Sequence, residues 1–181
     1  MITINSIIGN IYKDNKLMEK YHELTNRQLL EVIKIGRMEA QRVRMRKFSD
    51  KGSDVVLMLP QNTHLKHGDV LMLNEEKIIV LQIQPEKVAV IQLKDEPTDN
   101  DHYYPQRNHH HTFEIPVKIG HTIGNLHRPI KLEANKIFLP IQAESELDLL
   151  KRLFGSIKDH LYITSTTMVF EPEEGTEIHE H

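Results

Sequence analysis

The stretch SELDLLKRLFG, residues 145–155, decides the fold of the second half of the chain. Its apolar residues recur every three or four positions, which is the spacing of one helix face. Ser145 is a good helix cap, Asp148 approximates the acidic third position of a capping box, and Gly155 is a good helix stop. The stretch therefore predicts a helix from Ser145 to Gly155 whose buried face consists of Leu147, Leu150, Leu153 and Phe154.

Strand and helix signals alternate on both sides of this stretch. Residues 88–93 and 162–170 are predicted strands, and residues 130–133 and 136–139 form a predicted hairpin. Pro116 suits the first turn of another helix that runs toward Gly124. The resulting order of elements, βαββαβ, is that of a ferredoxin-like domain.

The first half of the chain is mostly β. Short apolar runs separated by turn residues predict a small β-sandwich-like domain, with strands at residues 2–8, 42–46, 55–59, 70–73 and 78–83. Residues 17–38 are the exception, because Asn26 resembles a helix start and Leu29, Leu30 and Ile33 resemble a helix face.

These elements place the chain in the α+β class and predict three parts. A β-sandwich-like N-terminal domain covers residues 1–86, and a ferredoxin-like domain covers residues 87–170. A flexible, histidine-containing tail covers residues 171–181. Residues 94–112 are a polar, histidine-rich insertion that we expect to lack secondary structure.

Composition excludes several classes of function. The chain has 181 residues, a net charge of -3 and no cysteine, so it has neither thiolate chemistry nor the basic character of a nucleic-acid-binding protein. No apolar run is long enough to span a membrane, and we recognise no signal peptide, so we expect a cytoplasmic protein. No phosphate-binding loop, zinc-protease motif or nucleophile elbow is present, and we expect no enzymatic activity.

The placement of the histidines indicates metal binding. The chain has twelve histidines, six of them between His102 and His127. Imidazole is the commonest protein ligand of borderline transition metals, so nickel, copper and zinc are the candidate ions. The candidate ligands are His127, the consecutive His109, His110 and His111, and the terminal His179 and His181.

His127 is the best candidate among these. Gly124 and Asn125 permit a left-handed exit from the preceding helix, which would present His127 just beyond the helix end. A single imidazole does not hold a metal, but a twofold dimer would bring two copies of His127 together. The alternative is an ordinary hydrogen-bonded ring near a helix C-terminus. His121 lies off the spacing of chelating histidines in a helix, and we expect only an exposed polar residue there.

The other histidines have weaker geometry. His109, His110 and His111 cannot all reach one ion from an extended segment, because alternate side chains point to opposite sides. Two of the three could share an ion, and the alternative is a polar linker. His179 and His181 would share one side of an extended tail, although an acidic tail is usually only solvated.

Arg42, Arg44 and Arg46 alternate with apolar residues. This pattern predicts a strand with the arginines on one face. A solvated sheet face is the simplest interpretation, and a docking surface for an acidic protein partner is the functional one.

Four phrases together resemble the urease accessory protein UreE family of nickel metallochaperones. They are GNLHRP at residues 124–129, FEPEEG at residues 170–175, the helix at residues 147–155, and LKHGDVL at residues 65–71 followed by PEKV at residues 85–88. Leu126 replaces the arginine usual in the first phrase. The family's additional ligand histidines after the central hairpin have no counterpart at residues 139–142.

The resemblance implies a homodimeric carrier with no part in urea hydrolysis. His127 would bind nickel at the dimer interface, and the N-terminal domain would bind a peptide or partner. Ni(II) would be cargo that passes through an accessory GTPase to the urease apoprotein complex. Three alternatives remain open from the residues alone: a general zinc, copper or nickel buffer or sensor, a protein-interaction module with incidental histidines, and a metal hydrolase.

Overall fold

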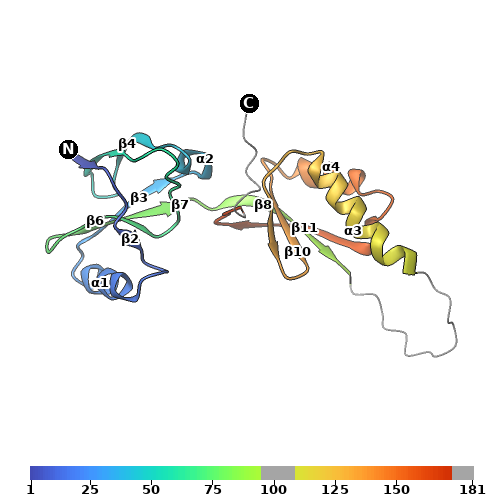
Figure 1. Ribbon diagram of the computed structural model, residues 1–181, viewed down its shortest axis with the longest axis horizontal. Coiled ribbons are helices and arrows are strands. Elements are labelled where there is room, and N and C mark those ends of the chain that lie inside the picture. The colour runs from blue at the N-terminus through green and yellow to red at the C-terminus, as the bar shows by residue number, and fades with distance from the viewer. Residues whose placement is uncertain (95–108, 173–181) are drawn as a thin grey trace. The chain divides into compact units, whose positions relative to one another are not determined.

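The computed structural model describes residues 1–94 and 109–172. The chain divides into two compact units, Met1–Pro85 and Glu86–His181 (Figure 1). No helix in the described ranges is long and apolar enough to cross a membrane.

The first unit contains two β-sheets and two helices. One sheet has the strand order β1-β5-β4 and the other has the order β2-β6-β7-β3. The pairs β1–β5 and β3–β7 are parallel, and the other pairs are antiparallel. The elements are β1 (Ile2–Ile4), β2 (Gly9–Asn10), α1 (Asn15–Asn26), β3 (Leu30–Ile35), α2 (Arg37–Ala40), β4 (Arg44–Phe48), β5 (Asp54–Met58), β6 (Asp69–Leu73) and β7 (Ile78–Ile83).

The helix predicted within residues 17–38 is wrong in position. Asp14 caps α1 by accepting hydrogen bonds from the backbone of Lys16 and Leu17, and the helix ends at Asn26, which the sequence had suggested as a start. Gln28 then has a φ of 60°, a left-handed conformation that breaks the helix. Leu30 and Ile33 instead belong to β3, because this segment gains a six-residue parallel pairing with β7.

The strand predicted at residues 2–8 is divided. Only Ile2–Ile4 forms β1, which pairs with β5, and the chain then crosses to the other sheet as β2. The chain turns at residues 67–68, just before β6, and this turn depends on Gly68. Gly68 has a φ of 84°, and a Cβ there would lie 2.5 Å from the Tyr12 ring.

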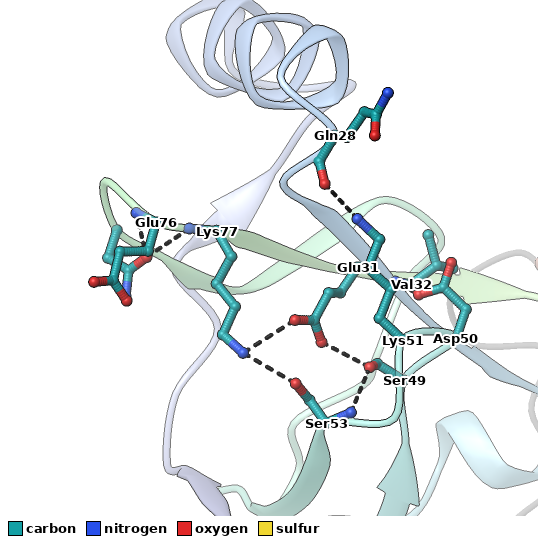
Figure 2. A network of polar contacts seen from close by, with 10 residues as sticks. Gln28, Glu31, Val32, Ser49, Asp50, Lys51, Ser53, Glu76 and Lys77 are labelled. Carbon is teal, nitrogen blue, oxygen red and sulfur yellow. Dashed lines mark hydrogen bonds and ion pairs between the residues drawn. The ribbon is translucent and has the colours of Figure 1, made fainter.

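A buried carboxylate links the two sheets of the first unit (Figure 2). Glu31 on β3 is 7% exposed and accepts hydrogen bonds from Ser49 Oγ at 2.6 Å and from Lys77 Nζ at 3.0 Å. Lys77 Nζ also donates to Ser53 Oγ at 3.0 Å. Burial raises the pKa of Glu31, but the hydrogen bonds from Ser49, Ser53 and Lys77 outweigh burial and hold the pKa below its ordinary value.

We expect Lys77→Met to destabilise the protein by about 1–3 kcal/mol at neutral pH, because it leaves a buried carboxylate without its cation. Since the pKa of Glu31 is lowered by folding, its contribution is complete above the ordinary value of 4.5 and is lost as the pH falls through the folded value. The cost of Lys77→Met should therefore shrink in acid. Urea unfolding at several pH values measures both effects.

Lys20→Met is the matched control, because Lys20 pairs with Glu23 on the exposed surface of α1. Its expected cost is below about 1 kcal/mol. Equal costs for the two variants would contradict a structural role for the Glu31 network.

The second unit confirms the ferredoxin-like order. Its four-stranded sheet has the order β11-β8-β10-β9, with every pair antiparallel. The two long helices lie on one face of this sheet (Figure 1). The elements are β8 (Glu86–Leu93), α3 (His109–Gly124), β9 (Lys131–Glu133), β10 (Lys136–Pro140), α4 (Ser145–Leu153), the short 3₁₀ helix Lys158–His160 and β11 (Leu161–Met168).

The predicted buried face of α4 is right at three of four positions. Leu147, Leu150 and Phe154 are buried in the core beneath the helices, whereas Leu153 is 45% exposed. Ser145 is the first helical residue rather than the cap, and Glu144 occupies the cap position without a side-chain hydrogen bond. The side chain of Glu146, in the first turn, instead accepts from the backbone N–H of Gln142, which precedes the helix, at 2.9 Å.

Helix α3 is longer than predicted. It begins at His109, so Pro116 lies inside it and the triple histidine is helical, not part of an extended linker. An interior proline removes one backbone hydrogen bond and costs about 3 kcal/mol. Burial of Ile115, Ile119 and Ile123 against the sheet favours the helix, and an ion pair between Glu114 and Lys118 at 2.5 Å spans the proline.

The opposite face of the sheet holds the start of the C-terminal segment. Phe170 is fully buried there against Val88 and Phe138. Residues 171 and 172 then leave this cluster, and the predicted tail from residue 173 onward lies outside the described residues. Phe170 thus fixes the point from which the histidine-containing segment departs.

Candidate metal centre

His127 lies just beyond the C-terminal end of α3. The chain tightens there, because Leu126 N–H donates to Ile123 O at 3.0 Å and His127 N–H donates to Gly124 O at 3.1 Å. His127 has a φ of 48° and an exposed side chain. The left-handed exit was predicted at Gly124 and Asn125, but the tight turns delay it to His127 itself.

A left-handed backbone at a residue with a Cβ costs about 1–2 kcal/mol. Histidine accepts this conformation more readily than most residues do, but surrounding contacts must still hold the turn. The candidate ligand is therefore presented by a turn whose geometry depends on its neighbours.

Arg128 is the residue that holds the turn from the other side. Its Nη1 donates to the backbone carbonyl of Pro140 at 3.0 Å and also contacts the carboxylate of Glu146. Glu146 is half-buried and accepts the Gln142 N–H with its other oxygen. One side chain thus ties the segment after His127 to the end of β10 and to the start of α4.

The contact between Arg128 and Glu146 joins two opposite charges. Burial raises the pKa of Glu146, but the hydrogen bonds from Arg128 and the backbone of Gln142 lower it more, so the pKa lies below its ordinary value. Glu146 is therefore an ionised partner for Arg128 at neutral pH, and their charge-assisted contact is stronger than a neutral hydrogen bond.

An apolar pocket of about 470 Å³ borders His127. It lies between the flank of α3 and the β9–β10 hairpin, and Gly120 and Gly124 form part of its wall. Leu132 on β9 contributes an exposed apolar side chain. The remaining apolar lining consists of Leu93, Pro116, Ile119, Ile123, Ile130 and Ile137.

The structure describes only some of the predicted metal ligands. His109, His110 and His111 lie in the first turn of α3. His179 and His181 lie outside the described residues, so their part stays a prediction. His121 is exposed on α3, and its Nε2 lies 3.2 Å from the side-chain nitrogen of Asn125. The described ranges contain no group of three or more histidine or acidic side chains placed to hold a metal ion.

Sequence reasoning missed the residues that hold the turn. Arg128 follows His127 directly and Glu146 lies in the first turn of α4, but they are far apart in the sequence. The only available signal was an arginine immediately after the candidate ligand, and nothing in the sequence identifies its acidic partner.

The chain is similar to known urease accessory proteins. Residues 4–84 match the model of the UreE urease accessory protein N-terminal domain. The urease accessory protein UreE 1 of Pseudomonas syringae pv. tomato is 24% identical over 159 residues, which cover 88% of this chain and 96% of that protein. Residues 4–84 therefore match a UreE N-terminal domain, and the chain is similar to UreE urease accessory proteins over most of its length.

Urease accessory proteins UreE of Yersinia pestis and Yersinia pseudotuberculosis are also similar. Each is 28% identical over 156 residues, which cover 86% of this chain but 63% of the relative's length. The names of these UreE proteins describe accessories of an enzyme and not the enzyme itself. This agrees with the expectation that the chain is not an enzyme.

We expect a double-mutant cycle with Arg128→Ala and Glu146→Gln to show a coupling free energy of about 1–3 kcal/mol, because the pair is half-buried and charge-assisted. Chemical unfolding of the four proteins measures it. The pair Lys151 and Asp148, exposed on α4 at 3.7 Å, is the control, with an expected coupling below about 0.5 kcal/mol. Equal coupling in the two cycles would show that Arg128 does not hold the turn.

Proposed function

We propose that this protein is a member of the UreE family and acts as a homodimeric, cytoplasmic nickel carrier that delivers Ni(II) for maturation of the urease active site. The presentation of His127 carries the proposal. Its imidazole is exposed on a left-handed turn, and Arg128 ties the following segment to two other elements. A fixed backbone with an accessible imidazole suits a site that must both bind and release its cargo.

One imidazole is too few ligands for tight binding of nickel, so the proposal needs a second copy of the chain. A twofold axis near His127 would place two equivalent imidazoles beside each other. His179 and His181 are proposed to complete the coordination. His109, His110 and His111 are proposed as additional histidines that raise the local supply of ligands.

The apolar pocket beside His127 is the proposed dimer contact. Large apolar side chains exposed around a pocket indicate an interaction surface, and Leu132 is 48% exposed at its rim. Gly120 and Gly124 have open space where a side chain would stand, so a second backbone can approach α3 closely there. The same contact would bring the two His127 residues near each other.

The proposed partners of the dimer are the urease accessory GTPase and the urease apoprotein complex. The similarity to UreE urease accessory proteins supports this assignment. Zinc and copper are the competing ions, because imidazole binds both of them and binds copper more tightly than nickel.

We expect the wild-type dimer to bind one nickel ion tightly and His127→Ala to weaken this binding by at least about 100-fold, since loss of even a supporting group around a metal costs roughly 10–100-fold. Isothermal titration with NiCl₂ measures affinity and stoichiometry. His121→Ala removes an exposed histidine of α3 and should leave the tight site intact.

Truncation after Pro172 is a second arm of the same experiment, and it should weaken nickel binding without removing the site. A tight ion per dimer in His127→Ala would contradict the assignment of His127. Unchanged affinity after truncation would contradict only the proposed role of His179 and His181.

Leu132→Glu should convert the dimer to a monomer, because it introduces a charge into the proposed apolar contact. Sedimentation velocity distinguishes the 21.2 kDa chain from a species of twice that mass. Leu153→Glu is the control, because Leu153 is 45% exposed on α4 and does not line the pocket. Dissociation by both variants, or by neither, would contradict this contact.

A further inference from the structure

Strand β4 has a backbone edge that pairs with no other described strand. It lies at the border of the sheet β1-β5-β4 and pairs only with β5. Hydrogen bonds from Leu59 N–H to Val43 O and from Ser49 N–H to Ser53 O fix which residues face β5. In an antiparallel pair such residues alternate with residues whose N–H and C=O groups point away from the partner.

This alternation determines which backbone N–H and C=O groups of β4 are available to pair with another strand. Residues 43, 45, 47 and 49 use their backbone groups toward β5, so the N–H and C=O groups of Arg44, Arg46 and Phe48 point to the open side. The pairing is regular from Arg44 to Phe48, and the strand contains neither proline nor glycine. Many exposed edge strands carry a bulge or a proline that prevents pairing with another chain, and β4 has neither.

The side chains of the same three residues are exposed. Phe48 is 63% exposed, and Met58, opposite Arg44 on β5, is 48% exposed. Arg46 pairs with Asp54 at 2.8 Å and lies 5.9 Å from the centre of the Phe48 ring. Arg44 has no ion-pair partner among the described side chains. The strand thus presents one unpaired cation and one exposed aromatic ring beside its open backbone groups.

The charge around β4 determines which kind of strand can bind at its open edge. Residues 37–51 contain six basic and two acidic residues, although the whole chain has a net charge of -3. Of the two acidic residues, Glu39 is paired with Lys47, and Asp50 accepts a hydrogen bond from the backbone N–H of Val32. Asp54, just outside this range on β5, is paired with Arg46. A second strand with acidic residues at alternate positions would therefore meet complementary charge, whereas a basic strand would be repelled.

We propose that the open edge of β4 binds an extended acidic segment of a partner protein, which adds to the sheet as a further strand. Backbone groups of Arg44, Arg46 and Phe48 would supply the hydrogen bonds. Arg44 would select acidic side chains, and Phe48 would pack against an apolar residue of the segment. This surface lies in the first unit and does not involve His127, so it can fail or hold independently of nickel binding.

The test uses the full chain and a short fluorescein-labelled peptide in which glutamate and valine alternate. Fluorescence anisotropy should show saturable binding that weakens as salt is raised. The same peptide with lysine in place of glutamate should not bind. A peptide that keeps the glutamates but has proline in place of valine should also fail, because proline removes the N–H of every second residue and its fixed φ disfavours strand pairing.

Two substitutions of Arg44 test separately the contribution of its side-chain charge and that of its backbone N–H to peptide binding. Arg44→Glu reverses the charge and should weaken binding at least about tenfold. Arg44→Pro removes an N–H that points away from β5, so it blocks the edge without removing a bond of the existing sheet. Lys34→Glu makes the same charge change at an exposed position of β3 and should leave binding unchanged.

Backbone amide resonances give a readout that does not depend on any variant. Peptide addition should shift the amide signals of Arg44, Arg46 and Phe48 and slow their hydrogen exchange, and should change those of Met45 and Lys47 less. Equal binding of the proline peptide, equal binding of a DNA oligonucleotide, or loss of binding in Lys34→Glu would each overturn the proposal.

Discussion

The candidate centre depends on one constraint: a left-handed turn that is held at both ends. Before the turn, α3 is fixed to the sheet by Ile115, Ile119 and Ile123. After it, Arg128 contacts the Pro140 carbonyl and the Glu146 carboxylate. His127 stands between these two attachments, so its backbone is determined by packing on one side and by charge on the other. An imidazole on a free loop would lose more conformational entropy on binding a metal.

The same arrangement explains why the candidate ligand His127 lies beside an apolar surface. The helix residues that pack on the sheet leave the flank of α3 open toward the β9–β10 hairpin, and the pocket forms there. A protein that binds metal with one side chain per copy needs a second copy at that place. Ligand and proposed contact surface therefore arise from one structural feature, the end of α3 next to the hairpin.

The sequence predicted the second unit better than the first, and the reasons are physical. Local signals determine α4, the hairpin and β11, because amphipathic spacing and turn residues act over a few positions. The division of residues 17–38 into α1 and β3 was missed because the parallel pairing of β3 with β7 joins distant segments. Pro116 suggested a helix start, but burial of three isoleucines favours a helix that continues through it. For the candidate site, the sequence predicted His127 as a ligand, which stays a prediction, and missed Glu146, whose contact with Arg128 only the fold creates.

The central claim is that two copies of His127 hold one nickel ion. The most direct test is a crystal structure of the nickel-loaded full chain, with anomalous diffraction data collected at the nickel absorption edge. We expect one nickel peak on a twofold axis, coordinated by His127 and by His127 of the second copy. A nickel peak bound elsewhere, with both imidazoles of His127 uncoordinated, would contradict it.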